Sequence, residues 1–239
     1  MRVPSFADHL AASFPPDIAM PAELRLALDW LEAESAVIDT PSGPCATLYP
    51  ADSDAPEARQ SYAAFLVPEP GASAQMLGPH PPRDAGARLS LFLCTGGDGS
   101  YAGLWCDDAG RQVWVHHGSG SGSVWFDVIT DNTLDLLRFL AIGYAEPAFD
   151  ECHDLTPEAA FLHSEGLTAA EADALDPAAL PPRPIPPLAF QAFLIRQFNT
   201  TIPACATEII TSPLGRGDQP GTPGHVTPDN PFFRWLMSR

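Results

Sequence analysis

Short apolar segments separated by glycine-rich turns occupy the middle of this chain, and they constrain its fold more than any other feature. From Thr95 to Pro147 the sequence reads TGGDGSYAGLWCDDAGRQVWVHHGSGSGSVWFDVITDNTLDLLRFLAIGYAEP. Between Gln112 and His116, valines alternate with tryptophan and histidine, as in a strand whose two faces differ. Short links between such segments are typical of antiparallel neighbours. The region therefore predicts a meander of antiparallel strands followed by one helix.

The pattern of apolar residues extends this expectation over the whole chain. We expect strands at Ala46–Tyr49, Tyr62–Val67, Arg88–Cys94, Tyr101–Cys106, Gln112–His116 and Val124–Ile129. We expect helices at Pro21–Glu34, from Asp131 or Asn132 to Gly143, as two short acidic helices within 156–176, and at Leu188–Asn199. Residues 71–86 and Leu214–Asn230 read as loops, and Pro231–Leu236 as an aromatic tail docked on the core. The predicted class is α+β, with a mostly antiparallel sheet flanked by helices in a single domain, 1–239.

The chain is strongly acidic, with 30 acidic and 12 basic residues and a formal net charge of −18. Binding to nucleic acid requires a basic surface, so this charge argues against nucleic acid as a partner. The same charge argues against anionic membranes. It permits fast association with a basic protein. A simpler interpretation is that the acidity only keeps the protein soluble.

The acidic residues concentrate in one segment, from Glu146 to Asp176, which contains no arginine. This segment holds Glu146, Asp150, Glu151, Asp154, Glu158, Glu165, Glu171, Asp173 and Asp176. Such a one-sided segment is either a solvated face or a docking face for a basic protein. The candidate partner contacts are Glu146, Asp150, Glu151, Asp154, Glu158 and Glu165.

Cysteine usage and the N-terminal residues indicate a cytoplasmic protein, and the overall composition indicates a bacterial one. The five cysteines include no CxxC pair and suggest neither a metal site nor a disulfide framework. The first 20 residues contain prolines and resemble neither a signal peptide nor a membrane span. All 12 basic residues are arginine, and alanine and proline are abundant, which GC-rich bacterial codons would produce.

Three motifs suggest chemistry, but their context does not favour it. Gly97–Ala102 matches a dinucleotide-binding glycine pattern, yet it leads into a strand instead of a helix. His116 and His117 are adjacent on a predicted strand, so they point to opposite faces and do not easily share a metal ion. The run Gly118–Ser123 lacks the spacing of a nucleophile elbow. We therefore expect no catalytic residues, no metal and no cofactor.

Three of these stretches together resemble one known family. GGDGSYAGLW, QVWVHHGSGSGS and LDLLRFLAIGYAEP occur in the order and spacing typical of the SUKH superfamily, also called the Smi/Knr domain. The resemblance covers a signature core at 89–146 and returns at the C-terminal helix and aromatic tail, 188–239. Residues 147–187 depart from the family pattern and read as an acidic helical insertion with a proline-rich connector, PAALPPRPIPP.

The resemblance implies an α+β single domain without catalytic residues. Its signature positions imply structural roles for Gly97, Asp98, Gly99, Ser100, Trp105 and Gly143. The superfamily includes bacterial immunity proteins that bind and neutralise toxins, and a yeast regulator of cell-wall synthesis. The expected function is therefore that of a non-catalytic immunity-type protein, whose partner is a toxin such as a basic nuclease. It would act as a monomer or weak homodimer.

Two alternatives to this function stay open. The first is a regulatory scaffold of the Smi/Knr type, which would bind a protein other than a toxin. The second is a hydrolase with a site near Cys152 and His153, in which Asp154 or His116 would also take part.

Overall fold

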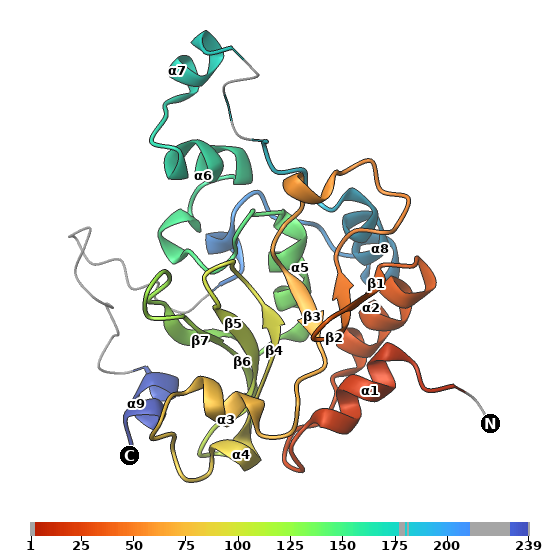
Figure 1. Cartoon of the computed structure of the whole chain (residues 1–239), viewed down its shortest axis with the longest axis vertical. Coiled ribbons are helices and arrows are strands. Elements are labelled where there is room, and N and C mark those ends of the chain that lie inside the picture. Colours follow the sequence, from red (N-terminus) through yellow and green to blue (C-terminus); the bar gives the residue numbers. More distant parts are fainter. Residues whose placement is uncertain (1–2, 177–179, 181, 211–229, 239) are drawn as a thin grey trace.

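The computed structural model describes residues 3–176, 180, 182–210 and 230–238 (Figure 1). Within these residues, seven strands form one sheet in chain order, and each strand is antiparallel to the next. The strands are β1 (Val37–Thr40), β2 (Gly43–Thr47), β3 (Ala64–Leu66), β4 (Leu89–Cys94), β5 (Tyr101–Cys106), β6 (Gln112–His117) and β7 (Phe126–Thr130). The predicted α+β class and the antiparallel meander are confirmed.

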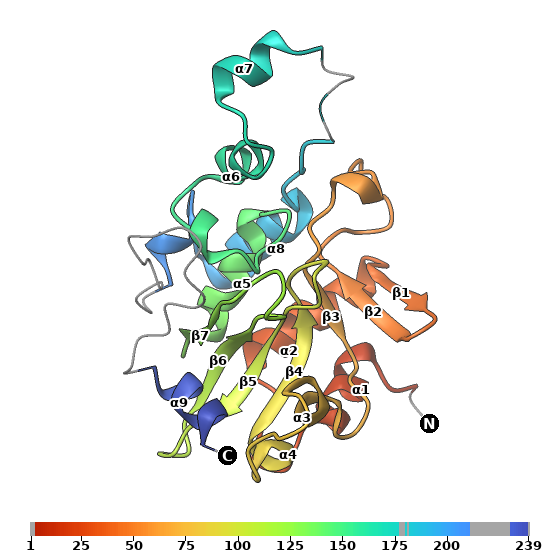
Figure 2. The same ribbon diagram turned by 60° about the vertical axis from the view of Figure 1, so that its left-hand side comes forward.

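Helices cover both faces of this sheet. The helices are α1 (Phe6–Ser13), α2 (Ala22–Ala33), α3 (Ala72–Met76), α4 (Ala85–Arg88), α5 (Thr133–Ile142), α6 (Pro157–Ser164), α7 (Ala169–Ala174), α8 (Leu188–Phe198) and α9 (Pro231–Met237). Of these, α1, α2, α5 and α8 bury side chains in the larger core on one face. On the other face, α4 and α9 contribute to the smaller core, with α3 packed beside it. The pair α6 and α7 extends beyond one end of the sheet (Figure 2). In the described chain, no helix combines the length and the apolar character needed to cross a bilayer.

The alternation along β6 divides its side chains between the two cores, as predicted. Trp114 packs in the larger core, whereas Val113 and Val115 pack in the smaller one. On the smaller-core face, helix α9 places Phe232 and Trp235 against Trp105, with ring centroids 5.5 Å apart in both pairs. The predicted docking of the aromatic tail is confirmed, and the tail is helical because Asn230 caps it and proline begins it.

Several local predictions were wrong or incomplete. Residues 71–86 do not form a plain loop, because α3 lies within them and α4 begins there; prolines and glycines around both short helices hide them in the sequence. Helix α1 was not predicted, although Ser5 and Asp8 form a capping box at its start. Strand β1 was also missed, because it is a short strand at the sheet edge with two exposed and two partly buried residues, and so lacks an apolar run. Most of the predicted loop at 214–230, and 177–179 and 181 of the predicted connector, lie outside the described residues.

Replacing Gly103 should test the close packing of the central strands. A Cβ atom at Gly103 would lie 1.9 Å from the carbonyl oxygen of Ser90, next to the register shift between Leu91 and Leu93. Because backbone atoms cannot move aside easily, Gly103→Ala should lower the free energy of unfolding by about 3 kcal/mol. Urea unfolding followed by circular dichroism measures this change.

The matched control is Gly86→Ala in α4, where the added Cβ would meet no atom within 4 Å. Alanine favours helix by about 0.5–1 kcal/mol over glycine, so this variant should be as stable as the wild type or slightly more so. Equal stabilities for the two variants would contradict the packing described for β4 and β5.

Candidate functional site

Three loops meet at one end of the sheet. The loop cluster comprises residues 95–100 between β4 and β5, residues 118–125 between β6 and β7, and residues 143–149 after α5. Two hydrogen bonds bring the third loop against the others. The Ala148 amide donates to the Thr95 carbonyl at 3.1 Å, and the Ser123 hydroxyl donates to the Ala148 carbonyl at 2.7 Å. These two bonds therefore hold the backbone of the third loop in a fixed position against the other two.

The carboxylate of Asp98 joins the first two loops. It accepts hydrogen bonds from the Ser100 amide at 3.0 Å and the Ser100 hydroxyl at 2.9 Å. It also accepts from the Ser119 hydroxyl at 2.8 Å and the Ser123 amide at 2.6 Å. Partial burial alone would raise the pKa of Asp98, but the bonds from Ser123, Ser119 and Ser100 lower it below its usual value. Asp98 and Ser100 therefore form part of the hydrogen-bond network that holds the first two loops together.

Glycine is required where these loops approach one another. A Cβ atom at Gly122 would lie 2.5 Å from Oδ2 of Asp98, so any other side chain would displace the carboxylate. Gly99 has a φ of 89°, which places it in the left-handed region that favours glycine. The remaining signature positions lie elsewhere: Gly143 ends α5, and Trp105 is buried in the smaller core beneath α9.

Two buried histidines support the loop cluster from below. Nδ1 of His116 lies 2.9 Å from the Trp125 carbonyl, which can only accept, so Nδ1 carries the proton. Nε2 therefore accepts from the Thr95 hydroxyl at 2.8 Å. Burial lowers the pKa of His116 to about 3, so the neutral ring is the form present at neutral pH. His153 is also buried, with Nε2 3.0 Å from the Pro147 carbonyl.

The geometry does not favour the catalytic and metal alternatives. Burial raises the pKa of the Cys152 thiol to about 11, which keeps it protonated and unreactive at neutral pH. Asp154, two residues further along the chain, is exposed, whereas His153 is enclosed by aromatic rings. His117 contacts Phe126 on the opposite face of β6 from His116, as predicted. In the described ranges, no group of three or more His, Cys, Asp or Glu side chains could hold a metal ion.

Glu146 lies at the surface of the loop cluster and is half-buried. Its Oε2 accepts a hydrogen bond from the Gly97 amide at 2.9 Å. Burial, together with the nearby charge of Asp98, raises the pKa of Glu146 above its usual value. The structure thus places one predicted contact residue directly beside the glycine-rich signature.

Tyr62 belongs to the same surface, and sequence analysis did not identify it as a contact residue. Its ring lies over Gly97, where a Cβ atom would be only 3.1 Å from the Tyr62 Cε1, and the residue is 54% exposed. Its amide donates to the Ala145 carbonyl at 2.8 Å, which fixes it beside Glu146. No sequence pattern signals this position, because it depends on the loop after α5 passing next to the start of β3.

The other predicted contacts follow the chain from the loop cluster to α6 (Figure 1). Asp150 is half-buried in a 3-10 turn at Asp150–Cys152, whereas Glu151 and Asp154 are exposed. Glu165 is exposed at the end of α6. Glu158 differs from these, because its carboxylate forms an ion pair with Arg183. The acidic segment is thus mainly a solvated surface that continues from the loop cluster.

Three comparisons with known proteins found no match for this chain. No protein-family model matches the chain, and neither a curated protein nor a solved structure matches it.

The role of Asp98 can be tested through the pH dependence of stability. We expect Asp98→Asn to lose about 1–3 kcal/mol at pH 7, because hydrogen bonds to a charged acceptor are the stronger ones. The folded-state pKa of Asp98 lies below its ordinary value of 3.8, so this stability is present above that value and is lost as the pH falls through the folded-state pKa. The difference between wild type and variant should therefore shrink below about pH 4 in urea unfolding.

Asp39→Asn provides the control, because Asp39 is exposed on β1. Its stability should differ from that of the wild type by less than about 0.5 kcal/mol at every pH. A constant gap between wild type and Asp98→Asn from pH 7 to pH 3 would show that the ionised carboxylate is not what joins the loops.

Proposed function

We propose that this chain is a non-catalytic bacterial immunity-type protein that binds and neutralises a basic toxin, such as a nuclease. The proposed contact surface, here called the acidic face, consists of Tyr62, Glu146, Glu151 and Glu165. The observation that carries the proposal is the exposed Tyr62 ring beside the half-buried carboxylate of Glu146, both held on the loop cluster. The resemblance of residues 89–146 to the SUKH superfamily supports the same function.

The energetics of Glu146 favour a binding role over a purely structural one. Its raised pKa means that ionisation at neutral pH costs free energy of folding. A guanidinium or ammonium group from a partner would offset this cost by pairing with the carboxylate. Tyr62 would supply an apolar ring with a hydroxyl group, a combination enriched among residues that dominate binding energy.

Long-range charge would then guide the partner toward this surface. Glu151 and Glu165 are exposed and form no ion pair within the described residues, so their charge is not neutralised by a neighbouring arginine. With a net charge of −18, the chain attracts basic proteins over a distance that salt shortens. This effect acts mainly on the association rate.

The chemistry of the thiols suits a reducing compartment. All five cysteines belong to the described part of the chain, and all five are free. We therefore assign the protein to the cytoplasm, where free thiols persist. A toxin made in the same cell would meet it there.

Reversing exposed charges should distinguish local attraction of the partner to the acidic face from the effect of the total net charge. The double variant Glu151→Arg/Glu165→Arg should reduce the association rate with its partner about tenfold at low salt and flatten the salt dependence. Stopped-flow mixing with the purified product of the neighbouring gene, chosen as the candidate toxin, measures both quantities.

Asp39→Arg/Asp52→Arg makes the same change in net charge at two exposed positions outside the acidic face. It should slow association much less. Equal slowing by both double variants would remove the acidic face from the proposal. Binding of a neighbouring gene product that is not toxic would favour the Smi/Knr-type scaffold instead.

Short-range contacts can be tested by removing one side chain at a time. Tyr62→Ala and Glu146→Gln should each weaken binding by more than about 1 kcal/mol, mainly through faster dissociation. Ionisation of Glu146 removes stability as the pH rises above its ordinary value of 4.5, so Glu146→Gln should be at least as stable as wild type at pH 7. Surface plasmon resonance and urea unfolding give the two readouts.

Leu188→Ala, at a position on α8 that is 65% exposed, serves as the control for Tyr62→Ala. It should leave the dissociation rate unchanged. If Glu146→Gln binds as tightly as wild type, Glu146 is not a contact residue.

A further inference from the structure

A hollow of about 530 Å³ lies where α6 meets the body of the protein. Most of its lining is apolar and includes Ile142 at the end of α5, Phe161 on α6, Pro184 in the connector and Ile202. Its volume falls within the range of about 300–1,000 Å³ that is usual for small-molecule sites, and such sites are mainly apolar with a few polar groups. All residues that line this hollow are described.

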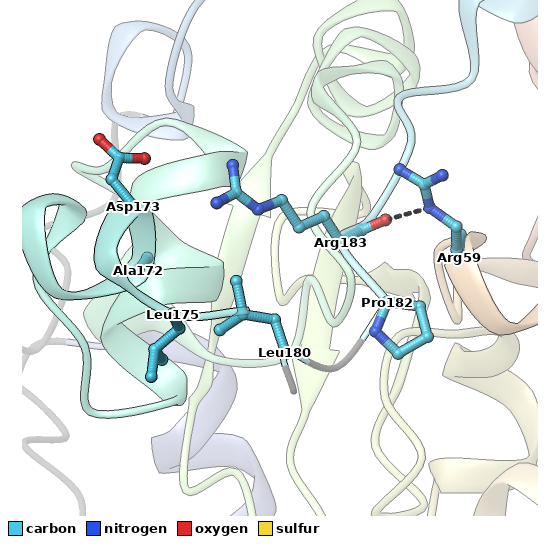
Figure 3. Close-up of a pocket in the computed structure, with 7 residues that line it drawn as sticks. All are labelled: Arg59, Ala172, Asp173, Leu175, Leu180, Pro182 and Arg183. Atoms are coloured by element: carbon cyan, nitrogen blue, oxygen red, sulfur yellow. Dashed lines mark hydrogen bonds between the residues drawn. The ribbon is translucent and has the colours of Figure 1, made fainter. Parts of the chain in front are cut away.

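The polar lining of the hollow is dominated by two arginines. Arg59 and Arg183 both line it, and both also line an adjacent hollow of about 620 Å³ beside α7 (Figure 3). Arg183 forms an ion pair with Glu158, which lines the same hollow. Arg59 forms no ion pair within the described part of the chain. Two positive charges and one negative charge leave the lining with a net charge of +1, in a chain whose total is −18.

A network of hydrogen bonds holds Arg59 in place. Its Nε donates to the Arg183 carbonyl at 2.7 Å, which orients the guanidinium group (Figure 3). Its own carbonyl accepts from the Ile185 amide at 2.8 Å. The Ile185 carbonyl in turn accepts from the buried Tyr49 hydroxyl at 2.7 Å. With Nε engaged, the two Nη groups of Arg59 have no hydrogen-bond partner among the described residues, so they are available to a ligand.

We propose that this hollow binds a small organic monocarboxylate with an apolar body. The carboxylate would accept two parallel hydrogen bonds from a guanidinium group, a geometry that suits arginine, and Arg59 is the residue positioned to supply it. The apolar body would lie against Phe161, Ile142 and Ile202. A phosphate is a poorer fit, because its second negative charge would need a further cation and Arg183 already pairs with Glu158.

The proposal extends beyond the binding of a protein partner and does not depend on it. Tyr62, Glu146, Glu151 and Glu165 do not line the hollow. A failure to bind small molecules would therefore not count against the acidic face, and a failure to bind a protein partner would not count against this hollow.

The test is a titration of the full chain labelled with ¹⁵N, using phenylbutyrate as the probe and phenylbutanol as its neutral counterpart. Phenylbutyrate should shift the amide signals of Ile142, Gln191 and Ile202, with a dissociation constant in the millimolar range or tighter. Phenylbutanol should bind at least about tenfold more weakly, because it cannot pair with a guanidinium group.

Two variants and one control locate the binding. Arg59→Gln should weaken phenylbutyrate binding about tenfold, whereas Arg196→Gln, an exposed position on α8 outside the hollow, should not change it. Ala204→Trp should block the hollow without removing any charge, since Ala204 is an exposed part of the lining. It therefore keeps the test valid if Arg59→Gln does not fold.

Four outcomes would overturn the proposal, the last of them with a peptide as the probe. The first is the absence of shifts at the lining residues, and the second is equal affinity for phenylbutyrate and phenylbutanol. The third is binding that Ala204→Trp leaves intact. If acetyl-Ala-Ala-Phe binds with its free carboxylate but phenylbutyrate does not, the hollow recognises peptide ends and the small-molecule class is wrong.

Discussion

The four hydrogen bonds to Asp98 decide the shape of the surface on which the proposed function depends. The two loops that it joins consist mainly of glycine and serine, whose side chains contribute little apolar surface. A charged acceptor shared by Ser100, Ser119 and Ser123 supplies the missing constraint. The same bonds keep the carboxylate ionised, so stability and loop geometry depend on one group.

This arrangement has a consequence for the neighbouring carboxylate. The charge on Asp98 adds to the effect of burial on Glu146, whose pKa rises, while the pKa of Asp98 falls. The two acidic residues therefore act differently although they lie close together. Asp98 stabilises the loops, and Glu146 remains a partly desolvated charge at the surface, where pairing with a basic group would offset the cost of its desolvation.

Tertiary structure also separates the acidic segment into parts with different surroundings. Glu146 lies beside Tyr62, Glu158 pairs with Arg183 above an apolar hollow, and Glu165 faces solvent. These residues look equivalent in the sequence. The proline-rich connector produces the difference, because residues 182–187 return from α7 to the body and bring Arg183 back over α6. One segment therefore contributes to two distinct surfaces.

The sequence alone determined the α+β class, the strands β4 to β7, helix α5 with a cap at Asp131 or Asn132 and its end at Gly143, and the two faces of β6. These features follow from local periodicity and from the backbone preferences of glycine and asparagine, which act over a few residues. Tertiary structure alone decided that Tyr62 lies over Gly97, that Asp98 joins two loops, and that Arg59 meets the connector. Each of these contacts joins residues that are distant in the chain or lie in different loops, and no pattern in the composition of either partner specifies the other.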